Sequence, residues 1–109
     1  MSRAKGEKAE ERACHFLQEA GFCIEARNFY ARFGELDIVA SKDGVLHFIE
    51  VKSGRSYEEA LQNLTPKKLA RVIKTAQLYQ KKHNTAEEFC IDAIIVTPLE
   101  IEHLQNITL

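Results

Sequence analysis

One hairpin, GELDIVASKDGVLHFIEVK over residues 34–52, most constrains how this chain can fold. Two apolar segments flank Asp43-Gly44, a pair typical of a two-residue turn between antiparallel strands. With these two residues in the turn, cross-strand pairing places Asp37 opposite Glu50. Because residues two apart on a strand share a face, these charges gather on one side of the hairpin. The other side is predicted to be apolar and to carry Leu36, Ile38, Ile49 and Val51.

Directly opposed like charges destabilise a strand pair by about 0.2–1 kcal/mol, so stability alone does not explain Asp37 opposite Glu50. A divalent cation such as Mg²⁺ reverses this cost, because it prefers hard oxygen ligands. Lys52 is predicted to reach the same site, where its ammonium group can orient water or stabilise negative charge. Together these residues suit the hydrolysis of a phosphodiester. The alternative is a solvated face on which Glu35 and Lys52 form an ordinary ion pair.

The remaining apolar patterns predict helices and strands in the order α-β-β-β-α-β. A helix is expected from about Lys5 to Ala20, followed by the strand FCIEARNFY and then the hairpin. Thr65 and Pro66 are typical of a helix start, and an apolar stripe continues to His83. FCIDAIIV predicts a further strand, and IEHLQNI a final edge strand. This order indicates an α/β fold, with a mixed sheet flanked by helices in a single domain over residues 1–109.

Basic residues are concentrated in one part of a chain whose formal net charge is only −1. Between Lys52 and His83 there are eight Lys or Arg residues and two acidic ones. Such an asymmetry is typical of a face that binds a polyanion, although a solvated amphipathic helix is the alternative. The candidate nucleic-acid-binding residues are Lys67, Lys68, Arg71, Lys74 and Arg55. No base-reading element is recognised, so structure-specific rather than sequence-specific binding is expected.

Asp37 followed by Glu50-Val51-Lys52 resembles the motif of the PD-(D/E)xK nuclease superfamily, which has the restriction-endonuclease-like fold. Gly6-x-x-x-Glu10 resembles the first helix of archaeal-type Holliday junction resolvases. Nearly the whole chain resembles the YraN-like family of uncharacterised predicted endonucleases. The matching blocks are ACHFLQEAGF, Asn28, GELDIVA, FIEVK, LTPKKLARVIKTAQLY and CIDAIIV.

The resemblance implies a Mg²⁺- or Mn²⁺-dependent endonuclease that acts on DNA, branched or damaged, in repair or recombination. It implies that Glu10, Asp37 and Glu50 are catalytic and bind the metal together with the Val51 carbonyl. Lys52 is the fourth catalytic residue, and Glu35 is expected beside the site. The alternative function is a nucleic-acid-binding module that acts by recruiting partners. Homodimer formation is left open.

Other features predict less. No apolar run approaches the ~20 residues that span a bilayer, and a cytoplasmic protein without a membrane partner is expected. The three cysteines are expected to be reduced thiols in the core rather than a zinc site. Asp92, within an apolar strand, is predicted to be a structural residue or one that supports the site from behind, rather than a direct metal ligand. The histidines show no ligand spacing and are predicted to be surface or packing residues: His15, His47, His83 and His103.

Overall fold

The computed structural model describes residues 3–85 and 88–107, with side chains from residue 6 onward. It contains three helices and five strands among these residues. In chain order they are α1 (Arg3–Glu19), β1 (Cys23–Ala31), β2 (Gly34–Lys42), β3 (Val45–Ser53), α2 (Tyr57–Leu61), α3 (Pro66–His83), β4 (Glu88–Val96) and β5 (Ile101–Leu104).

The strands form one mixed sheet in the order β1-β2-β3-β4-β5. β3 and β4 run parallel, because α3 carries the chain back across the sheet between them, and the other neighbouring pairs are antiparallel. The predicted α/β fold, a mixed sheet flanked by helices, is therefore confirmed. The short α2 lies in the segment before α3, and β5 is the final edge strand. No helix among the described residues is long and apolar enough to cross a membrane.

The hairpin register agrees with the sequence. Ile38 pairs with Ile49 and Lys42 pairs with Val45, which leaves Asp43 and Gly44 in the turn. Their φ angles are 52° and 80°, so both residues adopt the left-handed backbone that this kind of turn requires.

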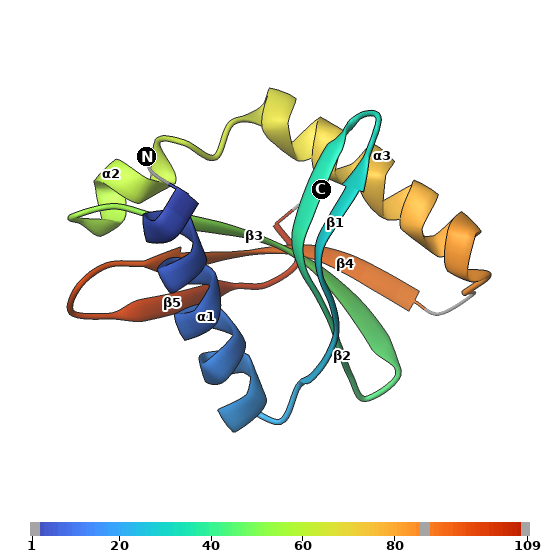
Figure 1. The fold of residues 1–109 in the computed structure, drawn as a ribbon, viewed down its shortest axis with the longest axis horizontal. Coiled ribbons are helices and arrows are strands. Elements are labelled where there is room, and N and C mark those ends of the chain that lie inside the picture. Colours follow the sequence, from blue (N-terminus) through green and yellow to red (C-terminus); the bar gives the residue numbers. More distant parts are fainter. Residues whose placement is uncertain (1–2, 86–87, 108–109) are drawn as a thin grey trace.

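The two long helices lie on opposite faces of the sheet (Figure 1). An apolar core lies under each of them. α1 packs Ala13 and Leu17 against a core that includes Ile38, Ile49 and Ile94. α3 starts where Thr65 caps it, with a hydroxyl that accepts a hydrogen bond of 3.2 Å from the Lys68 amide. Its stripe covers the second core, whose members include Val39, Phe48, Val72, Ala76 and Tyr79.

The predicted apolar face of the hairpin is wrong at Leu36. Ile38 and Ile49 lie in the core under α1, whereas Leu36 lies in the core under α3. The simple alternation of side chains along β2 is broken between Leu36 and Ile38, in the part of β2 that pairs with β1 but no longer with β3. On the other side of Asp37, Asn28 of β1 has a φ of 53°, which interrupts the regular strand.

Candidate metal and nucleic-acid site

Three carboxylates from three different elements interact electrostatically at one end of the hairpin. Glu10 comes from α1, next to Ala9 on the buried side of that helix, and Asp37 and Glu50 come from β2 and β3. Glu10 and Asp37 are both buried. The Asp37 carboxylate accepts a hydrogen bond of 2.8 Å from the Val51 amide, which ties it to the strand that carries Glu50.

Burial and mutual repulsion shift the pKa values of two of these groups. Burial, followed by the charge of Glu50, raises the pKa of Asp37 to about 8, although the Val51 amide opposes the shift. Burial also raises the pKa of Glu10, and the charge of Asp37 adds to that effect. Three carboxylates are thus held where like charges repel one another in a poorly hydrated space.

Lys52 and Glu35 border the same site. The Lys52 ammonium nitrogen lies 3.3 Å from Oε1 of Glu50, so Lys52 forms an ion pair with a residue of its own strand, β3. The alternative of a solvated face had Glu35 paired with Lys52; Oε2 of Glu35 is instead buried without a hydrogen-bond partner among the described residues. Its charge contributes to the raised pKa values of Glu10 and Asp37.

The donor set fits a hard divalent cation. Besides Oε2 of Glu35, Oε1 of Glu10 is buried and accepts no hydrogen bond from the described residues, and Arg27 lies 3.7 Å from that oxygen. A buried carboxylate oxygen without a hydrogen bond is costly unless a cation or a proton compensates it, and Arg27 supplies part of that compensation for Glu10. Glu10, Asp37 and Glu50 are therefore the residues that could hold Mg²⁺ or Mn²⁺. Val51 was expected to offer its carbonyl oxygen to the metal. Its contact in this site is made by its backbone amide, which donates to Asp37.

Basic residues of α3 face the carboxylates across a small pocket of about 160 Å³. Glu35 and Glu50 line one side, and Lys68 and Arg71 line the other. Lys67 and Lys74 lie along the same helix and line an adjoining cavity together with Arg71.

Arg55, the fifth candidate cation, is placed differently. It pairs with Glu59 of α2 at 3.5 Å and lines a separate pocket beside Arg12 and Pro98. The structure thus brings the four α3 cations together but not Arg55.

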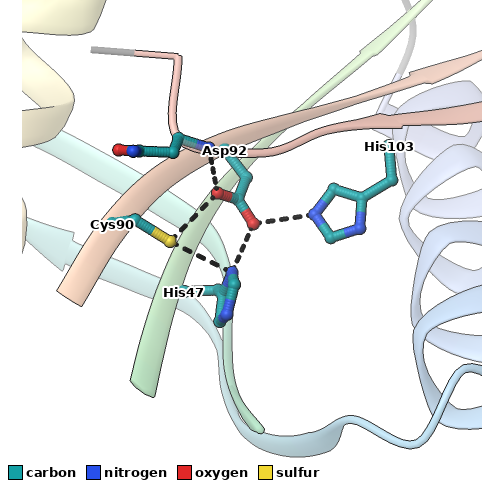
Figure 2. A network of polar contacts seen from close by, with 5 residues as sticks. His47, Cys90, Asp92 and His103 are labelled. Carbon is teal, nitrogen blue, oxygen red and sulfur yellow. Dashed lines mark hydrogen bonds and ion pairs between the residues drawn. The ribbon is translucent and has the colours of Figure 1, made fainter. Parts of the chain in front are cut away.

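A buried polar network that sequence spacing did not reveal surrounds Asp92, which is 0% exposed (Figure 2). His47 Nδ1 lies 2.6 Å from its Oδ2, and His103 Nε2 lies 2.7 Å from the same oxygen. The Asn106 amide and the Cys90 thiol donate to Oδ1 at 2.9 and 3.3 Å. Burial by itself would raise the pKa of Asp92, but the hydrogen bonds from His103, the Asn106 amide and His47 outweigh it and hold the pKa below its ordinary value.

The donor atoms of His47, Cys90 and Asp92 lie within 4.8 Å of one another and are of the kinds that zinc uses. Ligand atoms around tetrahedral zinc are about 3.3 Å apart, as its bond lengths require. The distance of 2.6 Å from His47 to Asp92 is a hydrogen-bond length instead. The cluster is accordingly a hydrogen-bonded network around a buried carboxylate, and the structural role predicted for Asp92 agrees with it.

Two smaller expectations are completed or changed. His47 and His103 do pack, with their rings edge-on to Phe22 at centroid distances of 4.9 and 5.5 Å, and both also contact Asp92, which the sequence did not predict. The thiols are free, but Cys23 is exposed rather than part of the core; Cys14 is buried and Cys90 is half-buried.

Comparison with known proteins identifies the relatives of this chain. The model of a family described as "Uncharacterised protein family UPF0102" matches residues 9–96. A UPF0102 protein of Wolinella succinogenes is 56% identical over 109 residues, which is the whole of both chains. A UPF0102 protein of Sulfurimonas denitrificans is also 56% identical over the full length of both. One from Helicobacter pylori strain HPAG1 is 52% identical over 97% of this chain and 92% of its own.

Proposed function

The chain belongs to the uncharacterised protein family UPF0102, and we propose that it is a divalent-metal-dependent endonuclease that hydrolyses DNA phosphodiester bonds. The observation that carries this proposal is the meeting of Glu10, Asp37 and Glu50 with Lys52 beside a basic helix. This arrangement supports a nuclease of the PD-(D/E)xK kind. Branched or damaged DNA is the proposed substrate.

Each part of the site has a distinct chemical task. Glu10, Asp37 and Glu50 would hold Mg²⁺ or Mn²⁺, which, when bound, polarises a phosphoryl oxygen and lowers the pKa of bound water. Lys52 supplies a fixed positive charge next to Glu50, where it can orient the attacking water or stabilise the negative charge that develops on phosphorus oxygens.

The α3 cations account for substrate binding. Lys68 and Arg71 face the carboxylates across the small pocket, so a phosphate held by them would lie at the edge of the acidic site. Positive charge is needed at the edge of the acidic site, because the carboxylates would otherwise repel a polyanion. Contacts of this kind position a nucleic acid without reading its sequence.

A cleavage screen over linear, flapped and four-way-junction DNA, with Mg²⁺ or Mn²⁺, tests the proposal. Wild type should cut at least one of these substrates, and Lys52→Ala should cut none while retaining most DNA affinity. Lys81→Ala is the matched control, since it removes an exposed lysine at the far end of α3. If wild type binds DNA but cuts nothing with either metal, the alternative of a recruiting module replaces the nuclease. If it does not bind either, α3 is only a solvated face.

A further inference from the structure

A second, larger cavity of about 770 Å³ adjoins the small pocket that Glu35 and Glu50 line. Its own lining combines cationic and aromatic side chains. One wall is the end of the β1–β2 hairpin, residues 30–35, which includes the turn at Arg32 and Phe33, and the other is the first half of α3. Figure 1 shows this turn lying beside α3. The cations of the cavity are Arg32, Lys67, Arg71 and Lys74, and its aromatic residues are Tyr30 and Phe33.

The side chains of Tyr30 and Phe33 are exposed, although the neighbouring aromatic residue Phe29 of β1 packs against the core. Tyr30 is 63% exposed and Phe33 is 38% exposed. In contrast, Phe29 packs edge-to-face against Tyr79, with ring centroids 5.1 Å apart. One exposed apolar residue needs no explanation, but two aromatic rings on one turn, both lining a cationic cavity, form a recognition surface.

Two cations from different elements lie over the Phe33 ring, so a base that stacks on the ring would replace one of them there. Arg32 Cζ lies 5.2 Å from the ring centroid, and Lys74 Nζ lies 5.3 Å from it. Aromatic rings bordered by Lys and Arg are how proteins bind single-stranded nucleic acid: a base stacks on the ring while the cations contact its phosphates. Within a duplex each base face is covered by its neighbours, so only an unpaired or terminal base can stack in this way.

The cavity and the smaller pocket beside Glu35 and Glu50 lie next to each other and share part of their lining. Phe33, Gly34, Glu35 and Arg71 line both of them, and Glu50 lines the second. A strand that stacks a base on Phe33 would therefore lead along Arg71 toward the carboxylates. We propose that the aromatic turn of residues 30–35 and α3 bind an unpaired nucleotide next to the cleavage site, which makes the substrate class DNA with a single-stranded segment. This inference rests on the proposed function for its assignment of nucleic acid as ligand.

Binding measurements with EDTA test the inference without requiring cleavage. Fluorescence anisotropy compares a labelled single strand, a flapped duplex, a blunt duplex and a single strand whose central residues are abasic. Wild type should bind the single strand and the flap more tightly than the blunt duplex. It should lose about tenfold in affinity on the abasic strand, because stacking one base contributes about 1–3 kcal/mol.

Substitutions locate the effect. Tyr30→Ala combined with Phe33→Ala should weaken binding of the single strand about tenfold or more, and should bind the abasic strand as weakly as wild type does. Phe33→Leu keeps an apolar side chain but removes the stacking face, so it should share the loss. Leu99→Ala, at a 96% exposed residue outside the cavity, should change nothing. Circular dichroism checks that every variant is folded.

The outcomes separate this inference from the proposed function. If the aromatic variants bind the single strand as wild type does, or lose blunt-duplex affinity equally, base stacking on this turn is refuted while metal-dependent cleavage can still stand. If wild type shows the stacking preference but cuts no substrate with either metal, the nuclease fails and the binding surface remains. If wild type binds none of the four oligonucleotides, this inference fails, and the cleavage screen with Mg²⁺ or Mn²⁺ decides the proposed function separately.

Discussion

Oδ2 of Asp37 accepts a 2.8 Å hydrogen bond from the amide nitrogen of Val51. Asp37 is nevertheless strained electrostatically, because burial and the neighbouring Glu50 raise its pKa to about 8. The hydrogen bond needs only an oxygen acceptor, which an asparagine also provides, whereas the repulsion needs a charge. The two contributions can therefore be separated by one substitution.

Asp37→Asn should raise the unfolding midpoint in metal-free buffer, and by more near pH 8 than near pH 5. The folded-state pKa of about 8 lies above the ordinary value of 3.8. The folded protein thus retains a proton that the unfolded chain releases, and stability falls as the pH rises through this window. The asparagine variant has no carboxyl group at this position, so it does not lose stability in this way as the pH rises. Thermal unfolding with EDTA at both pH values measures it, and a lower midpoint for the variant at both would show that Asp37 is a structural acceptor only.

Mn²⁺ should stabilise wild type against unfolding but should have little effect on Glu50→Gln. A cation that binds only the folded state stabilises it by about 2.7 kcal/mol at a hundred times its dissociation constant. Removal of one carboxylate charge should weaken that binding. Glu100→Gln, at an exposed residue between β4 and β5, is the control. Differential scanning calorimetry with and without Mn²⁺ gives the comparison, and equal stabilisation of wild type and Glu50→Gln would remove Glu50 from the proposed metal site.

Simultaneous replacement of Lys68, Arg71 and Lys74 by glutamine should weaken DNA binding about equally across different sequences. The slope of log affinity against log salt should become shallower by about 0.7–0.9 for each phosphate contact that is lost. The double variant Lys81→Gln, Lys82→Gln on the last turn of α3 serves as the comparison. Binding isotherms at several salt concentrations measure the slope, and an unchanged slope in the triple variant would mean that these cations do not contact phosphates.

The hydrogen-bonded network around Asp92 predicts that a substitution of this residue strongly lowers the free energy of unfolding. Asp92→Asn should destabilise the protein by about 3 kcal/mol, because an amide cannot accept every hydrogen bond that the carboxylate accepts from its buried donors. Asp43→Asn is a near-neutral control, since asparagine tolerates the positive φ of 52° at that turn residue. Urea unfolding provides the free energies, and a loss as small as that of the control would contradict the structural role.

The same network predicts acid sensitivity. The folded-state pKa of Asp92 lies below its ordinary value, so its contribution to stability is present above the unfolded-state pKa. It is lost as the pH falls through the folded-state pKa. Asp92→Asn should therefore unfold with a weaker acid dependence below about pH 4 than wild type, as measured by circular dichroism during acid titration.

Local patterns determined much of the fold. The Asp43-Gly44 turn and the period of two along each strand were sufficient for the register that pairs Ile38 with Ile49. Thr65, Pro66 and the apolar stripe after them were sufficient for α3. These features depend on neighbours in the chain, on backbone angles and on side-chain alternation, all of which a sequence displays.

The sequence determined the candidate metal site only in part. Asp37, Glu50 and Lys52 belong to one hairpin, so their proximity follows from its register. The approach of Glu10 was implied by family resemblance, and it depends on how α1 packs across the sheet. Leu36 shows the limit of alternation, since Asn28 on the neighbouring strand interrupts the regular geometry around Asp37.

Tertiary structure alone decided the rest. His47, Asp92 and His103 come from β3, β4 and β5, and their separations in the chain carry no ligand spacing. The aromatic turn of residues 30–35 meets α3 only because β2, β3 and the β3–β4 crossover bring them to one end of the sheet. Contacts of this kind depend on the sheet order and on which face each helix covers. Those are decided by burying both apolar faces of the sheet at once, which no local pattern specifies.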